Sequence, residues 1–264
     1  MLEDRRYDSE ELNFYSNYQH IISENFTLTG GLSYQSQTVD NFKVVDDLLG
    51  GDYFVDIDAF AVRDFPDNEG VQQNDLNNPN RIVTVGDRFG WSYDIEVRRG
   101  SGWLQGQYNL KRFDLFVAGE FSQTQFWRNG KYRTGRFPES SFGESEKQTF
   151  NNYAVKGGAT FKLDGRNYFF ANGAYMTRAP FSRNAFVSPR TRDQLVPGLE
   201  SETIYTGELG YLLRSPNVQA RASVYYTQFQ NQTEIIRFYN DIQRAFGSLV
   251  LTGQDQLHQG AELA

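Results

Sequence analysis

The chain of 264 residues has no cysteine, only two histidines and no long apolar run. No stretch approaches the roughly 20 apolar residues that a membrane-spanning helix needs. A membrane location would therefore require a closed barrel, because lipid offers no hydrogen-bond partners to open strand edges. The absence of cysteine fits an oxidising compartment in which no disulfide is wanted. The net charge of −7 argues against nucleic acid as a partner.

Aromatic residues, in contrast, are abundant, with 22 Phe and 16 Tyr. The mean hydropathy is nevertheless low, at −0.62. A high aromatic content and a low mean hydropathy are compatible when single apolar residues alternate with polar ones along strands. A barrel wall has this composition, because one face of each strand meets lipid and the other meets a wet lumen.

Apolar and polar residues alternate over many segments, which is typical of strands with one apolar face. In the first segment Leu12, Phe14 and Tyr18 alternate with Asn13 and Asn17. The predicted strands cover about 12–22, 26–35, 91–110, 113–121, 152–163, 168–176, 204–213, 218–227 and 257–264. Long loops are predicted at about 40–90, 128–148, 178–200 and 235–255, and short turns separate the remaining pairs of strands.

The third predicted strand changes phase. Its apolar residues are odd-numbered from Trp91 to Val97 and even-numbered from Leu104 to Leu110. One extra residue would switch the faces, so a β-bulge is predicted within 99–102.

Short and long connections alternate strictly, which is the arrangement of outer-membrane barrels. The predicted fold class is all-β: an antiparallel up-and-down transmembrane β-barrel of about nine strands, which is partial. Single-chain bacterial barrels have even strand numbers, and an open sheet leaves two edges that aggregate. The charged segment after Met1 contains no signal peptide, and the chain stops at Ala264 inside a predicted strand. Both ends are therefore expected to be cut.

The segment 200–210 contains Glu202, Tyr205, Gly207 and Glu208, and it is followed by Ala222, Tyr225 and Tyr226. Together these residues resemble a late barrel hairpin of TonB-dependent outer-membrane receptors. Thr177-Arg178-Ala179-Pro180 and Gly260-Ala261-Glu262 are similar to segments before and after that hairpin. Residues 46–53 and 85–98 resemble receptor segments from the Bacteroidetes.

This resemblance implies that residues 1–264 are one partial barrel domain of a receptor with about 22 strands and a plugged lumen. The plug, the signal peptide and the first and last strands are expected to be absent. The implied function is TonB-dependent uptake of a scarce nutrient (siderophore-bound iron, a vitamin or a glycan) across the outer membrane of a Gram-negative bacterium. The implied partners are lipid, lipopolysaccharide, the cargo, and the TonB complex through the missing plug. No enzyme activity and no cofactor are predicted.

Two alternatives remain open. A passive porin would share the wall pattern without a plug. An outer-membrane hydrolase would need a histidine near Ser or Asp, and His258 is the one histidine predicted on the lumen side, because His20 falls on the lipid side. Glu120, Lys156, Glu208 and Glu262 are also predicted to face the lumen, where charge is tolerated.

The first long loop is rich in aspartate, and Asp52, Asp56 and Asp58 are a candidate set of Ca²⁺ ligands. Their spacing fits no EF-hand loop, so a solvated acidic surface is the favoured interpretation and no metal is predicted.

The third long loop is basic, and its arginines near a lumen mouth would attract an anionic cargo. Pairing with lipopolysaccharide phosphates or with acidic loops is the alternative. The candidate cargo-binding residues are Arg178, Arg183, Arg190, Arg192, Trp127 and Phe186. Aromatic residues near strand ends are predicted to anchor the barrel at the membrane interfaces. These residues are Tyr34, Trp91, Phe126, Trp127, Tyr175 and Tyr226.

Overall fold

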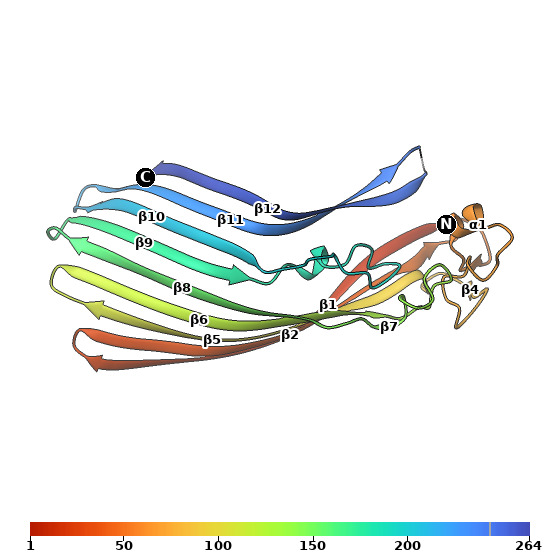
Figure 1. The fold of residues 1–264 in the computed structure, drawn as a ribbon, viewed down its shortest axis with the longest axis horizontal. Helices are drawn as coiled ribbons and strands as arrows, with labels where there is room; N and C mark the ends of the chain where they lie inside the picture. Colours follow the sequence, from red (N-terminus) through yellow and green to blue (C-terminus); the bar gives the residue numbers. More distant parts are fainter. Residues whose placement is uncertain (243) are drawn as a thin grey trace.

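A computed structural model describes residues 1–242 and 244–264 and shows one large antiparallel sheet (Figure 1). Within these residues the sheet joins nine long strands in the order β1-β2-β5-β6-β8-β9-β10-β11-β12, and the short strand β7 pairs with β6. The sheet does not close on itself, because β1 and β12 form its two edges. The fold is therefore a partial up-and-down barrel, as the alternation predicted.

The long strands are β1 (Leu2–Ser23), β2 (Phe26–Asp47), β5 (Arg88–Asn109), β6 (Phe113–Gly130), β8 (Gln148–Lys162), β9 (Asn167–Arg178), β10 (Glu202–Arg214), β11 (Gln219–Asn240) and β12 (Ala245–Leu263). The loops hold β3 (Phe54–Val55), β4 (Ile82–Val83), β7 (Gly143–Glu144), the helix α1 (Ala59–Asp64) and the 3₁₀ turn η1 (Ser182–Asn184). Among the described residues, no helix has both the length and the apolar character to cross a membrane.

The strands are longer than predicted, mostly at the end that carries the long loops. The first long loop starts after Asp47 rather than at Asp40, and residues 128–130, which were predicted to begin the second long loop, belong to β6. Residues 235–240 and 245–255 of the fourth predicted loop are strand, since β11 and β12 form one hairpin that extends to Asn240 and Ala245, while residue 243 lies outside the described residues. Figure 1 shows this hairpin at the upper right, at the end opposite the short turns.

The predicted β-bulge at 99–102 is wrong. The pairing of β5 with β2 and with β6 runs without interruption from Arg99 to Trp103. Val97 and Leu104 therefore lie on opposite faces of a regular strand. The apolar residues before the supposed switch face the inside of the sheet, where a loop covers them.

The two faces of the sheet differ in chemistry. One face, here called the outer face, carries a band of exposed apolar side chains on every long strand. Its members are Leu12, Phe14, Tyr18, Leu32, Tyr34, Leu104, Tyr108, Leu115, Val117, Phe121, Tyr153, Val155, Phe169, Tyr205, Leu209, Val224, Tyr226, Leu257 and Leu263. The other face, here called the inner face, is the one that the long loops cover.

Polar side chains pair across strands on the inner face. The hydroxyl oxygens of Ser33 and Ser101 are 2.7 Å apart, and Arg99 donates to Glu120 over 2.9 Å. Glu120, Lys156, Glu208, Glu262 and His258 lie on this face, and His20 lies on the outer face, all as predicted. The register thus separates an apolar wall from a polar one, because residues two apart along a strand share a face.

Candidate functional site

Three long loops gather at one end of the sheet and form a structure that we call the loop cap. It comprises residues 48–87, 131–147 and 179–201. Its loops follow β2, β6 and β9, so they leave the sheet at the same end, beside the tip of the β11–β12 hairpin (Figure 1). Side chains and backbone of the cap contact the inner face, which makes this end the candidate functional site.

The first loop is organised around one buried carboxylate. Asp56 is only 2% exposed and forms an ion pair with Arg81. It also accepts hydrogen bonds from Asn74 Nδ2 over 2.7 Å and from the Gly90 backbone nitrogen over 2.8 Å. Arg81 donates in turn to the Tyr132 hydroxyl over 3.1 Å, and burial raises the pKa of that phenol while Arg81 opposes the rise. Asp56 therefore holds the first loop and connects it to the second.

The candidate Ca²⁺ ligands are not brought together. Asp56 is engaged by Arg81, and Asp58 caps α1 by accepting from the backbone nitrogens of Phe60 and Ala61 over 2.9 and 3.3 Å. Asp52 lies exposed in the same loop. Within the described residues, no cluster of acidic, histidine or cysteine side chains could hold a metal ion. A fully solvated acidic loop is also wrong for Asp56, which is buried.

The loops of the cap also meet through backbone hydrogen bonds. The Leu76 nitrogen donates to the Arg133 carbonyl over 2.7 Å, and the Asp193 nitrogen donates to the Ser140 carbonyl over 2.8 Å. The second loop passes very close to the end of β6 at Gly130, because a Cβ at this residue would stand 1.8 Å from the Ser141 carbonyl oxygen. The second loop therefore bridges the first loop and the third.

The third loop packs onto the inner face through an apolar cluster. Phe186 and Ala185 are fully buried against Phe126, and the two phenyl rings meet edge to face with centroids 6.4 Å apart. Partly buried residues surround them: Ile95, Val97, Phe150, Leu195 and Leu199. Phe186, a candidate cargo residue, thus holds the loop in place. Phe126 was predicted to be an interfacial anchor, but it lies on the inner face beneath the loop.

Arg128 fixes the same loop from below. Its side chain is among the most buried cations of the chain, with 2% exposure. Its Nε donates to the Pro189 carbonyl over 2.6 Å, and its Nη1 donates to the Ser141 carbonyl over 2.9 Å. Its guanidinium carbon lies 5.2 Å from the centroid of the Tyr93 ring. Sequence reasoning missed this residue, because a loop 61 residues away supplies the contact.

The four candidate arginines do not converge on one point, and the first of them, Arg178, is the last residue of β9 rather than part of the third loop. Arg178 forms an ion pair with Glu202 at 2.6 Å, and Arg183 stacks on Phe181. Arg192 lies over another aromatic ring, that of Phe137, with 4.4 Å between guanidinium and centroid.

Arg190 differs from the other loop arginines because its side chain contacts residues of the strands β5 and β1. Its guanidinium lies 4.9 Å from the Trp91 ring centroid, and its Nη2 donates to the Tyr7 hydroxyl over 3.3 Å. Trp91 was predicted to anchor the barrel at a membrane interface, but its ring contacts this cap arginine.

Trp127, the sixth candidate cargo residue, lies on the outer face. It pairs across the sheet with Glu96 and is 8% exposed. Arg98 and Lys147 lie over its ring at 5.4 and 4.4 Å from the centroid. The register of β6 therefore places the indole on the opposite face from Phe126 and the third loop.

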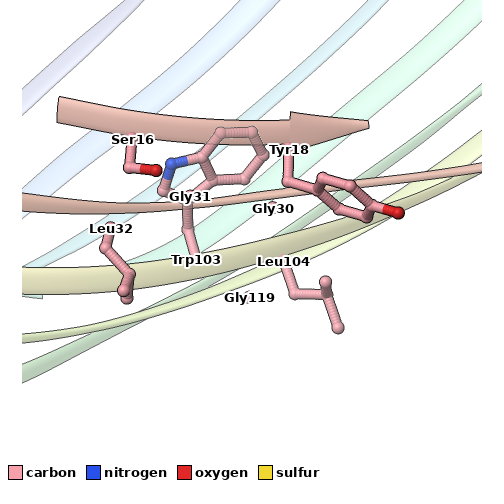
Figure 2. Close-up of a pocket in the computed structure, with 9 residues that line it drawn as sticks. Ser16, Tyr18, Gly30, Gly31, Leu32, Trp103, Leu104 and Gly119 are labelled. Atoms are coloured by element: carbon pink, nitrogen blue, oxygen red, sulfur yellow. The ribbon is translucent and has the colours of Figure 1, made fainter. Parts of the chain in front are cut away.

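A hollow of about 530 Å³ lies outside the loop cap, on the outer face of β1, β2 and β5 (Figure 2). Leu32 and Leu104 border it, with Gly30 beside them. Figure 2 shows both leucines on one side of the strands and Trp103 on the other. The hollow belongs to the apolar wall, away from the loop cap.

The open sheet with its cap places the chain among partial barrels, and comparison with solved structures agrees. No family model and no curated protein matches the chain. The copper transporter OprC matches with a TM-score of 0.69 and 10% identity, over 99% of this chain and 35% of that chain. The ferric citrate transporter FecA in its unliganded form matches with a TM-score of 0.60 and 13% identity, over 99% of this chain and 32% of that chain. The chain thus spans about a third of each structure and shares the barrel fold with both.

Proposed function

We propose that this chain forms part of the wall and the mouth of an outer-membrane transporter that takes up a scarce nutrient in a TonB-dependent manner. The observation that carries the proposal is the pairing of an apolar outer face with a polar inner face under a built loop cap. The barrel fold shared with OprC and FecA supports it, and so do the receptor-like motifs, including those of the Bacteroidetes type.

The outer face is suited to lipid. Contiguous exposed apolar side chains promote aggregation in water but match the hydrocarbon of a bilayer. The open edges at β1 and β12 would pair with further strands of the same barrel, because unpaired strand edges are costly in lipid. We therefore place the outer face against outer-membrane lipid, with lipopolysaccharide around the loop end.

The loop cap is suited to cargo capture. Arg183 and Arg190 are exposed cationic side chains of the third loop, and they are the first candidates for contact with a nutrient. Arg192 and Phe186 support that surface through their contacts with Phe137 and Phe126. Arg178 is paired with Glu202 in the sheet, and Trp127 lies on the outer face, so these two are the weaker candidates. The cargo is a small molecule or a glycan, and the TonB complex would act through a plug domain.

Two assays on the complete protein test this proposal. In liposomes the reconstituted protein should not let small sugars pass, because a plugged barrel has no open pore. In cells, nutrient-limited growth should depend on the protein and also on TonB. Free passage of sugars together with TonB-independent growth would contradict the proposal and indicate a passive porin.

A hydrolase is tested separately at His258. Its ring packs against Phe229 at 5.7 Å between centroids, and it makes no hydrogen bond with the rest of the described chain. His258→Ala should leave TonB-dependent growth unchanged. A loss of lipid or peptide hydrolysis in this variant would favour the enzyme.

A further inference from the structure

Three arginines from distant parts of the chain gather around Tyr93 on the inner face. Arg128 comes from β6, Arg190 from the third loop and Arg237 from the β11–β12 hairpin. Arg128 stacks on Tyr93, and Arg190 donates to Tyr7, two strands away. Arg190 also stacks on Trp91, whose ring centroid lies 5.8 Å from that of Tyr93, and Arg237 lies within electrostatic range of Tyr93 and Tyr7.

The position of Arg237 is fixed by the third loop. Its Nη2 donates to the Phe186 carbonyl over 3.2 Å and to the Arg183 carbonyl over 3.4 Å. The loop is tied to the same hairpin through Asn184 Nδ2, which donates to the Thr233 carbonyl over 2.9 Å. The hairpin therefore presents Arg237 beside the loop that carries Arg190, and the two cations repel each other.

None of these three arginines forms an ion pair within the described residues. Arg99 and Arg178, in contrast, pair with Glu120 and Glu202 at 2.9 and 2.6 Å. The negative charge of Asp193 attracts the Arg128 guanidinium from a distance, but the two side chains do not form an ion pair. Cations held near one another without carboxylates are unfavourable, and a bound anion relieves their repulsion.

Two of the three cations are accessible. Arg190 and Arg237 are exposed, and the side chain of Tyr7 is 56% exposed. A guanidinium has five N–H donors, so most donors of Arg190 and Arg237 remain open after the contacts above. Arg128 is buried behind them and contributes positive potential rather than direct contact.

We propose that Arg190 and Arg237, with the Tyr7 hydroxyl, form an oxyanion site on the lumen side of the loop cap. The ligand class is a carboxylate or phosphate group, which a planar guanidinium binds through two parallel hydrogen bonds. The inference rests on the proposed function in one respect, since it takes the anion to be part of a cargo. The same chemistry occurs in the phosphates of lipopolysaccharide, which is the other source of such a ligand.

The test uses the complete protein in detergent free of lipopolysaccharide, with pyrophosphate as the probe in calorimetric titrations. Wild type should bind pyrophosphate, and Arg190→Gln and Arg237→Gln should each weaken binding about tenfold or more, because each removes charged hydrogen bonds. Arg99→Gln is the matched control, as it removes an inner-face arginine that already has a carboxylate partner. It should change affinity less than twofold.

Folding and ligand source are checked in the same preparations. Arg190→Lys and Arg237→Lys keep the charge, so they should retain weakened binding and the protease resistance of the wild-type loops. Absence of pyrophosphate binding in wild type, or equal binding by the glutamine variants, would overturn the site. The wild-type protein could instead fail to bind pyrophosphate but co-purify with lipopolysaccharide, and the glutamine variants could carry less of it. That result would assign the arginines to lipid phosphate and would also overturn the proposed cargo site. Binding in detergent needs no energy input, so a failure of TonB-dependent uptake with intact pyrophosphate binding would count only against the proposed function.

Discussion

The two ends of the sheet are built by different rules. At the turn end, short connections such as 163–166 join neighbouring strands, and one local residue, Asp164, satisfies the backbone by accepting from the Arg166 and Asn167 nitrogens. At the loop end, contacts join residues 25, 61 and 183 positions apart, as in Arg81–Asp56, Arg128–Pro189 and Arg190–Tyr7. The turn end is local and repetitive, whereas the loop end resembles a small folded core set on a sheet.

This difference indicates which end of the sheet can carry a binding function. Alternation of apolar and polar residues along a strand fixes only which face of the sheet meets lipid, and many sequences have such an alternation. The loop end contains a buried carboxylate, a buried arginine and a packed aromatic pair, all of which need specific partners. Three substitutions and one pH titration test this contrast between the two ends of the sheet.

Asp56→Ala should have the largest effect, and it should be confined to the loop end. The variant leaves Arg81 without its carboxylate and the Gly90 nitrogen without an acceptor. Removing one partner of a buried pair costs about 3–5 kcal/mol. Hydrogen exchange should show this as faster opening of residues 70–90, with the turn end unchanged. Asp52→Ala, an exposed residue of the same loop, is the control, and equal exchange in both variants would contradict the role of Asp56.

Val155→Lys tests the outer face. Val155 is 53% exposed there, and a lysine at the centre of a bilayer costs about 2–4 kcal/mol. Ala154→Lys is the matched control, because Ala154 lies on the inner face opposite Glu120. Denaturant titration in lipid vesicles should show a lower unfolding midpoint for Val155→Lys alone. An equal loss in both variants would remove the distinction between the faces.

Gly130→Ala tests the close approach of the second loop. The added Cβ would collide with the Ser141 carbonyl and with Arg128, and overpacking of this kind costs about 1–3 kcal/mol. Limited proteolysis should then cut the 131–147 loop faster than in wild type. Gly100→Ala is the control, since a Cβ at Gly100 meets no atom within 4 Å. Similar proteolysis of both variants would show that the approach at Gly130 is not constrained.

Asp164 gives the smallest effect and belongs to the turn end. Hydrogen bonds from the Arg166 backbone, and then from Asn167, hold the pKa of its carboxyl below the ordinary value of 3.8. The charged form therefore stabilises the turn above that value, and the contribution is lost as the pH falls through the lowered pKa. An NMR titration that follows the Asp164 carboxyl should show a titration midpoint below 3.8. A midpoint at or above 3.8, or no difference from Asp164→Ala in acid stability, would contradict these bonds.

The period-two pattern predicted the turn end well. Its hairpins, its faces and the turn at Asp164 follow from neighbours in the sequence, and all are present in the structure. The predicted bulge at 99–102 failed for a physical reason. Ile95 and Val97 are apolar because the third loop covers them, whereas Leu104 is apolar because it lies on the exposed outer face.

The loop end was not predictable from periodicity. Beyond the apolar band both faces of a strand tolerate polar residues, so β1 and the β11–β12 hairpin run on without a visible pattern. The partners of Asp56 and Arg128 are distant in sequence, and no local signal identifies them. The basic character of the third loop was visible, but Arg237, which lies beside it in space, was not associated with it.

The proposed function requires that the outer face meets lipid and the inner face meets water. The chain has no cysteine, so single cysteines placed along residues 151–160 of β8 in the complete protein can be spin-labelled without background. In bilayers, the accessibility of each label to oxygen and to a water-soluble nickel chelate would be measured. We expect labels at odd residues such as Val155 to favour oxygen and labels at even residues such as Lys156 to favour nickel, with a period of two. A uniform preference along the strand would contradict it.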